Sequence, residues 1–239
     1  MSGTARERPL TTEGRPRRPI RSFVRREGRI TPGQAHALAE HWSEFGLKPG
    51  GRPIDWAEVF GRRALVACEI GFGDGRALLE MARNEPERDF LGVEVYRPGV
   101  GALLARLKES GLSNVRVAMM DAVELLRDCV PPESLDRLMI FFPDPWPKRR
   151  HHKRRLIQRP FVELAATRLR RGGRLHCATD WQDYAGQMME VLSSCSLMEN
   201  AAGPRRFADR PAYRPRTKYE RRGEGLGHRT WDLVFARKA

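Results

Sequence analysis

The sequence predicts an α/β fold with a doubly wound, mostly parallel sheet. From Ala64 onward, short apolar runs bounded by turn residues alternate with amphipathic segments, as in repeated strand–helix units. A glycine-rich turn follows the first run, and acidic residues stand at the ends of successive runs. Ligands bind at this edge of open α/β sheets. We expect one domain over residues 31–239, preceded by a flexible basic arm over residues 1–30.

Strands are predicted where aliphatic, β-branched and aromatic residues form short runs. They cover residues 65–70, 90–95, 115–120, 137–142, 174–179 and 231–236. Helices are predicted where apolar residues recur at helical spacing. They cover residues 34–44, 77–83, 100–108, 160–169 and 181–192.

Residues near the helix ends support two of these helices. Pro160 favours the start of one helix, and Gly172 with Gly173 would end it. Asp180 is placed to cap the helix over residues 181–192.

The formal net charge is +14, and the basic residues are concentrated in three segments. These are residues 1–29, 148–155 and 203–239, while the rest of the chain is mildly acidic. A surface built only for solubility intersperses its charges. Concentrated basic patches instead indicate a polyanionic partner, so we expect a nucleic acid.

Composition also excludes several classes of protein. No run of about 18 apolar residues is present, so no membrane span is expected. The Arg-rich N-terminus lacks the apolar stretch of a secretory signal, and we expect a cytoplasmic protein. Cys68, Cys129, Cys177 and Cys195 form no paired motif, so neither disulfides nor a metal site is expected.

The residues around the glycine turn indicate the kind of cofactor. Gly71 and Gly73 follow the pattern G-x-G-x-G and lack the longer pyrophosphate cradle of dinucleotide folds. Glu69 would repel a pyrophosphate but can accept a hydrogen bond from an ammonium group. Glu94 is placed to accept from ribose hydroxyls, and Asp121 from an adenine amino group. This set is typical of class I methyltransferases and favours S-adenosylmethionine over a nicotinamide cofactor.

A proline-rich loop after the fourth strand indicates a reaction site. Pro143, Pro145 and Pro147 stiffen the backbone around Asp144 and Trp146. A strand exit rich in proline would explain the outer prolines. It would not explain an acid and a tryptophan held between them, directly before a run of basic residues.

The motifs together resemble those of the bacterial tRNA (guanine-N7)-methyltransferases over roughly residues 60–236. Tyr219 stands where that family more often has Phe. The motifs are Glu69-Ile-Gly-Phe-Gly, Phe142-Pro-Asp-Pro-Trp-Pro-Lys-Arg-Arg-His-His-Lys-Arg-Arg155, Thr217-Lys-Tyr-Glu220, Gly227-His228 and Trp231-Asp-Leu233.

The resemblance implies a Rossmann-like class I fold with a seven-stranded sheet. It also implies transfer of a methyl group from S-adenosylmethionine to N7 of a guanine in the tRNA variable loop. Asp144 takes the catalytic position. Cofactor roles fall to Glu69, Gly71, Gly73, Glu94, Asp121 and Asp144. Substrate contacts fall to Lys148, Asp180, Thr217, Lys218, Tyr219 and Glu220, and an RNA-binding surface to Arg150, His151, His152, Lys153, Arg154 and Arg155.

The chemistry of guanine N7 is consistent with these residues. N7 carries an in-plane lone pair and no proton, so a strong general base is unnecessary. The reaction instead requires that N7 be aligned with the methyl group of the sulfonium, and that the positive charge growing on the purine be stabilised. Asp144 or Glu220 could accept from the guanine N1–H and amino group, and we favour Asp144. For Asp180, a role as the cap of the helix over residues 181–192 is as well supported as a substrate contact.

Two alternatives remain at this point. The loop around Asp144 loosely resembles those of methyltransferases that act on an exocyclic amine of RNA or DNA. A non-catalytic RNA-binding module with a relict cofactor pocket is the other. No obligate protein partner is evident, and the sequence allows a monomer or a homodimer.

Overall fold

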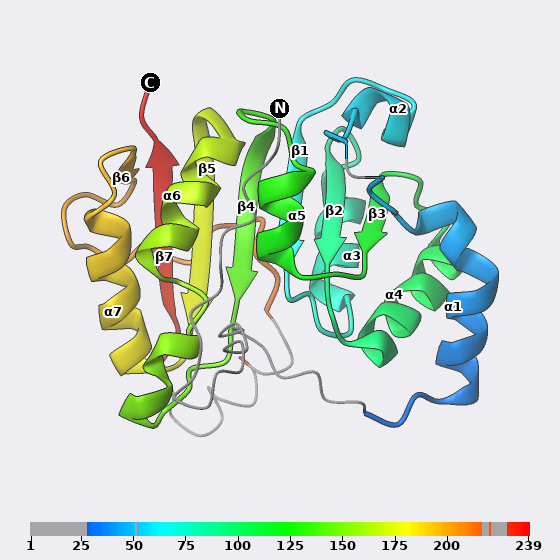
Figure 1. The fold of residues 1–239 in the computed structure, drawn as a ribbon, viewed down its shortest axis with the longest axis horizontal. Coiled ribbons are helices and arrows are strands. Elements are labelled where there is room, and N and C mark those ends of the chain that lie inside the picture. The colour runs from blue at the N-terminus through cyan, green and yellow to red at the C-terminus, as the bar shows by residue number, and fades with distance from the viewer. Residues whose placement is uncertain (1–27, 51, 217–219, 221–228) are drawn as a thin grey trace, which may run out of the picture.

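A seven-stranded sheet forms the centre of the molecule in the computed structural model (Figure 1). The structure describes residues 28–50, 52–216, 220 and 229–239. The strands are β1 (Val66–Ile70), β2 (Asp89–Val93), β3 (Val115–Ala118), β4 (Leu135–Phe141), β5 (Leu169–Thr179), β6 (Met198–Asn200) and β7 (Trp231–Arg237). They lie in the order β3-β2-β1-β4-β5-β7-β6. Strands β1 to β5 pair in parallel, whereas β7 is antiparallel to β5 and β6. The predicted doubly wound, mostly parallel sheet is confirmed.

Helices cover both faces of the sheet. They are α1 (Pro32–Phe45), α2 (Trp56–Phe60), α3 (Arg76–Asn84), α4 (Arg97–Ser110), α5 (Ala122–Asp128), α6 (Arg159–Arg168) and α7 (Gln182–Ser193), with a 3-10 helix η1 (Arg149–Arg154). In Figure 1, α5, α6 and α7 lie in front of the sheet and α3 behind it, with α1 and α4 toward the β3 edge. Each layer buries its own apolar cluster against the sheet, which is why β1, β2 and β4 are buried along their whole length. No helix within the described residues is long and apolar enough to cross a membrane.

Several helix ends follow the sequence signals, and two do not. Thr31 and Gln34 form a capping box that starts α1, and Pro160 lies in the first turn of α6. Gly172 and Gly173, however, do not end α6. That helix ends at Arg168, and both glycines lie inside β5, where Gly172 takes a φ of 74°.

The predicted cap of α7 by Asp180 is also wrong. Trp181 is the N-cap residue, and no side chain caps the helix. The hydroxyl of Thr179 instead accepts the Trp181 N–H at 3.2 Å, which turns the chain between β5 and α7. Helices α2 and α5, the 3-10 helix and the three-residue strand β6 were not predicted, because each is too short to develop a periodic pattern.

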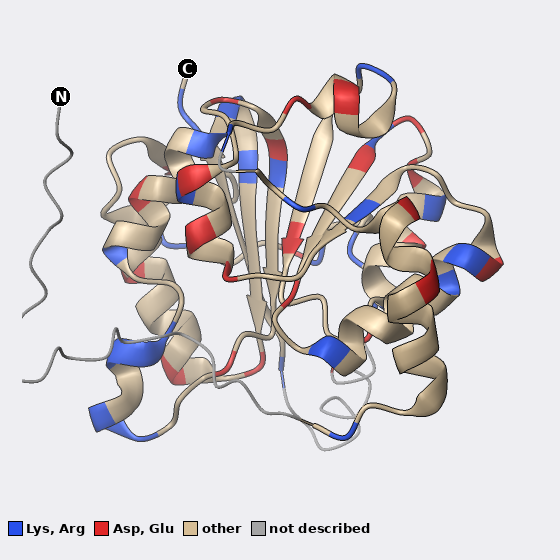
Figure 2. Cartoon of the chain, turned by 45° about the vertical axis from the view of Figure 1, so that its right-hand side comes forward, with Lys and Arg blue, Asp and Glu red and all other residues tan. Residues whose placement is uncertain are grey.

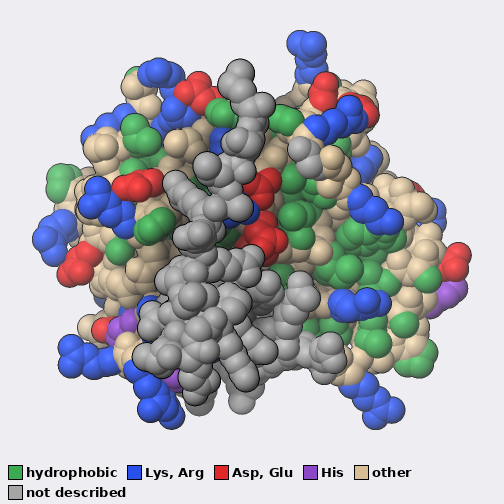
Figure 3. Space-filling view, viewed as in Figure 1, with side chains coloured by type: hydrophobic (Ala, Val, Ile, Leu, Met, Phe, Trp, Pro, Cys, Tyr) green, Lys and Arg blue, Asp and Glu red, His purple; other side chains and the backbone are tan. Residues whose placement is uncertain are grey.

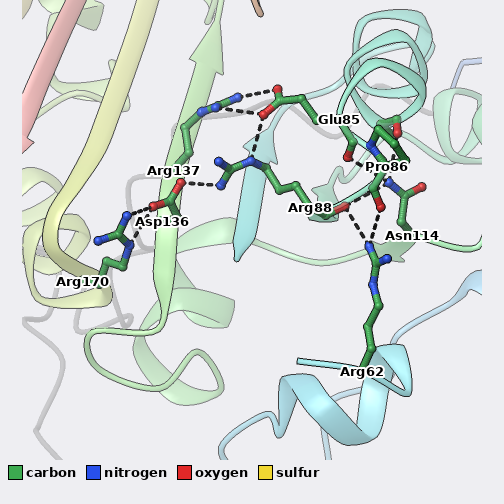
Figure 4. Close-up of polar contacts among 9 residues, drawn as sticks. Arg62, Glu85, Pro86, Arg88, Asn114, Asp136, Arg137 and Arg170 are labelled. Atoms are coloured by element: carbon green, nitrogen blue, oxygen red, sulfur yellow. Dashed lines mark hydrogen bonds and ion pairs between the residues drawn. The ribbon is translucent and has the colours of Figure 1, made fainter. Parts of the chain in front are cut away.

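A network of ion pairs ties together the amino ends of the parallel strands (Figure 4). Arg137 and Arg88 both donate to Glu85 at 2.9 Å, and Arg170 donates to Asp136 at 2.6 Å. Burial alone would raise the pKa of Glu85 and of Asp136, but the neighbouring guanidinium groups hold both below their usual range. This network lies at the edge of the sheet opposite the glycine turn. It stabilises the sheet at that edge.

Candidate active site

A cavity of about 230 Å³ opens at the carboxyl ends of the central strands. Four neighbouring strands contribute to its wall, because β3, β2, β1 and β4 are adjacent in the sheet and run in the same direction. Gly71 follows β1, Glu94 follows β2, Asp121 follows β3, and Asp144 follows β4. Residues far apart in the sequence are therefore brought together, including three carboxylates.

The glycine turn forms the part of the wall that follows β1. Gly71 and Gly73 have φ values of 75° and 61°, in the left-handed region that favours glycine. A Cβ added at either position would meet no atom within 4 Å, so the turn faces open space. A ligand can therefore approach the backbone closely here.

Glu69 lies in β1, two residues before Gly71, and does not line the cavity. Its side chain is buried, and Oε2 has no hydrogen-bond partner among the described residues. Burial, together with the negative charges of Glu94 and Asp74, raises the pKa of Glu69 to about 8. A buried carboxyl oxygen without a donor is uncommon and is consistent with a partner that arrives with a ligand.

Backbone amide groups hold the other two acids on this side of the cavity. Glu94 accepts from Val95 and Tyr96 through Oε1, at 2.7 and 3.0 Å, and from Gly73 through Oε2 at 3.1 Å. Asp121 is the N-cap of α5, and its Oδ1 accepts from Val123 at 2.8 Å. These bonds fix both carboxylates at the cavity wall and leave acceptor capacity for a ligand.

Asp144 stands exposed at the rim of the cavity, within a strained loop. Phe142 and Trp146, on either side of it, have φ values of 51° and 45°, which residues other than glycine rarely adopt. The Phe142 N–H donates to the carbonyl of Ala178 in β5 at 2.8 Å, which ties the start of the loop to the sheet. The Asp144 carboxylate accepts no hydrogen bond from any other described residue.

A basic surface adjoins this loop. Lys148 precedes the 3-10 helix η1 and is exposed, as are Arg150 and Lys153. Figure 2 shows the basic positions along this short helix, and Figure 3 shows Lys, Arg and His side chains around it at the lower left. His151 packs edge-on against Trp146 at 5.8 Å between ring centroids, and Arg154 lies over the same ring at 4.9 Å. The basic helix is therefore packed against the loop that carries Asp144.

Arg155 was predicted to belong to this surface, but the structure buries its side chain. Its exposed fraction is only 2%, although it directly follows the exposed helix η1 as its C-cap residue. Its guanidinium donates to the Pro145 carbonyl at 2.8 Å and, at 2.5 Å each, to Asp183 and Gln187 of α7. In a run of basic residues, nothing in the sequence distinguishes the one that is buried.

The remaining predicted substrate residues differ in where the structure places them. Asp180 is half-buried at the carboxyl end of β5, at the same edge of the sheet as the cavity. Thr217, Lys218 and Tyr219 lie outside the described residues. Glu220 is buried, with an exposed fraction of 4%.

Sequence reasoning missed Arg214, which holds Glu220. The Arg214 side chain is fully buried and donates to both oxygens of Glu220 at 2.8 Å. It also donates to Asp232 of β7 at 2.7 and 2.9 Å. Its guanidinium carbon lies 5.8 and 5.9 Å from the ring centroids of Phe141 and Phe142. Arg214 thus connects Glu220 with the sheet and with Phe142, where the loop that carries Asp144 begins.

The network continues from Asp232 across β5. Burial would raise the pKa of Asp232, but His176 and Arg214 hold it below its usual range. Because an ionised carboxylate only accepts, His176 Nε2–H donates to Asp232 at 2.7 Å and Nδ1 accepts from the Tyr213 hydroxyl at 2.9 Å. Burial also lowers the pKa of His176, which favours this neutral form.

The strand order, with β7 antiparallel between β5 and β6, and the ligand cavity at the carboxyl edge together define a class I methyltransferase fold. Solved methyltransferases have the same fold. The chain is similar to the 16S rRNA methyltransferase KamB, with a TM-score of 0.56 and 15% identity over 77% of this chain and 93% of that one. It is also similar to the 16S rRNA (adenine(1408)-N(1))-methyltransferase of Catenulisporales acidiphilia, with a TM-score of 0.53 and 15% identity over 78% and 92%.

Sequence comparison defines the family. A family model described as "Putative methyltransferase" matches residues 63–233. Proteins named tRNA (guanine-N(7)-)-methyltransferase match nearly the whole chain. The Methylococcus capsulatus protein is 54% identical over 93% of this chain and 96% of its own, and the Alcanivorax borkumensis protein 50% over 95% of each. The Escherichia coli protein is 52% identical over 94% of each. The chain belongs to the tRNA (guanine-N(7)-)-methyltransferase family, and the predicted resemblance is confirmed.

Proposed function

We propose that this chain transfers a methyl group from S-adenosylmethionine to N7 of a guanine in the variable loop of tRNA. One observation carries the proposal: Glu94, Asp121 and Asp144 line one cavity, and an exposed basic helix packs against the loop of Asp144. The high identity to relatives named tRNA (guanine-N(7)-)-methyltransferase supports the substrate and the atom.

Residues around the cavity fit S-adenosylmethionine. The open glycine turn at Gly71 and Gly73 allows close approach, and the unpartnered oxygen of Glu69 suits an ammonium donor. Glu94 accepts from ribose hydroxyls, and Asp121 accepts from the adenine amino group. When bound, S-adenosylmethionine supplies an electrophilic methyl group.

Asp144 orients the guanine and opposes the charge that develops on it. Because N7 has no proton to lose, the residue need not act as a base. Its carboxylate accepts from the guanine N1–H and amino group, which fixes the orientation of the base and therefore of N7. As the purine becomes positively charged, the same carboxylate stabilises it.

The basic helix and the residues near it bind the RNA. The exposed cations Lys148, Arg150 and Lys153 contact phosphates, and His151, His152 and Arg154 contribute beside them. Asp180, Thr217, Lys218, Tyr219 and Glu220 are proposed to contact or support the guanine. A tRNA substrate is consistent with a cytoplasmic location.

The test is methylation of unmodified tRNA with methyl-labelled S-adenosylmethionine, followed by nucleoside analysis. We expect label in 7-methylguanosine. Label in N6-methyladenosine instead would identify an exocyclic-amine methyltransferase. Binding of tRNA without any incorporation of label, and without binding of S-adenosylmethionine, would identify a non-catalytic RNA-binding protein.

A further inference from the structure

We propose that Arg155 is a positioning residue that holds Asp144 in place from within the protein, and that it does not contact RNA. The proposal rests on the proposed function above, because it assigns Arg155 to the loop at which that reaction occurs. We call residues 142–147 the Asp144 loop.

The contacts of Arg155 join this loop to α7. Its Nε donates to the carbonyl oxygen of Pro145, the residue directly after Asp144, at 2.8 Å. Its terminal nitrogens donate to Asp183 and Gln187, both at 2.5 Å. One planar guanidinium therefore fixes the backbone next to Asp144 relative to two residues of a helix.

The Asp144 loop has few bonds of its own with which to keep its shape. Pro143, Pro145 and Pro147 have no N–H to donate. The backbone at Phe142 and Trp146 is in the left-handed region, which persists only where surrounding contacts hold it. The hydrogen bond from Arg155 to Pro145 is one of those contacts, and it acts at the centre of the loop.

Helix α7 is a rigid support for this contact. Tyr184, Met188 and Leu192 are fully buried against the sheet. The Tyr184 hydroxyl accepts from the Ile157 N–H at 3.1 Å, and the Arg155 guanidinium carbon lies 4.7 Å from the Tyr184 ring centroid. Since Arg155 has an exposed fraction of 2%, its charge is not available to a phosphate.

The experiment compares Arg155→Lys with Arg88→Lys. Arg88 is a matched control, because it is also largely buried and paired with two acids, Glu85 and Asp136, but lies at the opposite edge of the sheet. Lysine keeps the charge, but its compact ammonium lacks the planar fork with which the Arg155 guanidinium reaches Pro145, Asp183 and Gln187. We expect kcat for tRNA methylation to fall about 10- to 100-fold in Arg155→Lys and to stay unchanged in Arg88→Lys. The Kd for tRNA and its salt dependence should stay unchanged in both.

Two results would overturn the proposal. One is a kcat for Arg155→Lys equal to that of the wild type. The other is a rise in the tRNA Kd with a shallower salt dependence, which would make Arg155 a phosphate contact. A wild type that methylates another atom would refute the proposed function, while the comparison of the two variants would still decide the role of Arg155.

A second variant covers the case in which Arg155→Lys does not fold. Asp183 is 63% exposed at the start of α7, so Asp183→Ala removes one support of Arg155 with little effect on the core. We expect kcat to fall about 3- to 10-fold, with unchanged binding of S-adenosylmethionine. An unchanged kcat here would also contradict the proposal.

Discussion

Arg214 and Glu220 face each other with both side chains buried, and two hydrogen bonds of 2.8 Å join them. Arg214 also donates to Asp232 near the start of β7, so one guanidinium neutralises two buried carboxylates. Residues 217–219, which are proposed to contact the substrate, lie between Arg214 and Glu220 in the sequence. Arg214 therefore joins Glu220 to the sheet through Asp232.

Removing the charge of Glu220 should destabilise the fold. Glu220→Gln leaves the buried Arg214 with one ionised partner, and we expect the free energy of unfolding to fall by about 1–3 kcal/mol. The measurement is urea unfolding. Glu163→Gln, which breaks a half-exposed pair with Arg159, is the control and should change stability by less than about 0.5 kcal/mol. Equal losses in the two variants would show that burial does not strengthen the Arg214–Glu220 pair.

Asp144 should be needed for turnover and not for RNA affinity. Because its carboxylate is exposed at the cavity rim and engages no described residue, Asp144→Ala should leave folding unchanged. Its tRNA Kd should stay nearly unchanged, since the basic helix provides most of the RNA contacts. We expect kcat to fall by about 100-fold or more. Asp128→Ala, at the far end of α5, is the control and should retain full activity. Turnover of Asp144→Ala equal to that of the wild type would remove the catalytic assignment.

Binding of S-adenosylmethionine should release a proton from Glu69. Burial raises the pKa of Glu69 to about 8, so the carboxyl is mostly protonated at neutral pH. A bound cation favours the ionised form, so affinity should rise as the pH increases toward 8. Calorimetry in buffers of different ionisation enthalpy measures the released proton. Glu69→Gln should abolish the release, and Glu80→Gln, exposed on α3, should not. Binding heats independent of the buffer would contradict the assignment.

Acidification should destabilise the network around His176. Burial lowers the pKa of His176 in the folded protein, whereas the unfolded chain titrates at about 6.5. As the pH falls, His176 becomes protonated in the unfolded chain before it does so in the folded protein. The free energy of unfolding should therefore decrease as the pH is lowered from about 7.5 to 5.5. His176→Gln should flatten this dependence, and His36→Gln, at an exposed position of α1, should not. Urea unfolding at the two pH values decides the point; identical slopes for His176→Gln and the wild type would contradict it.

The exposed part of the basic helix should contribute to RNA affinity through charge. Lys153→Ala should weaken tRNA binding and reduce the slope of log Kd against log salt by about 1, with kcat at saturation unchanged. Lys238→Ala, exposed after β7 at the opposite edge, is the control and should leave the slope unaltered. If both variants behave alike, the basic helix is not the RNA-binding surface.

The carboxyl edge of the sheet could be predicted because its signals are local. Apolar runs end at Gly71, Glu94, Asp121 and Asp144, and parallel strands bring such ends together whatever the rest of the chain does. Asp121 also caps α5, a helix that the sequence did not predict.

The buried arginines could not be predicted in this way. Arg155 and Arg214 each stand in a strongly basic segment, where a surface position is the usual outcome. Their burial depends on acceptors distant in the sequence, Asp183 and Gln187 for one and Asp232 for the other. The early start of β5 was also not predicted. Leu169 pairs with Leu135 of β4 and Arg174 pairs with Arg137, so Gly172 turns inside an irregularity of the strand and does not lie before it.

The most direct test replaces the acceptor atom itself. A tRNA in which the variable-loop guanosine is 7-deazaguanosine keeps the N1–H and the amino group but has a C–H in place of N7. Incorporation of labelled methyl from S-adenosylmethionine should fall to background on this tRNA, while its Kd matches that of the normal transcript. Undiminished incorporation would place the reaction at another atom and contradict the account.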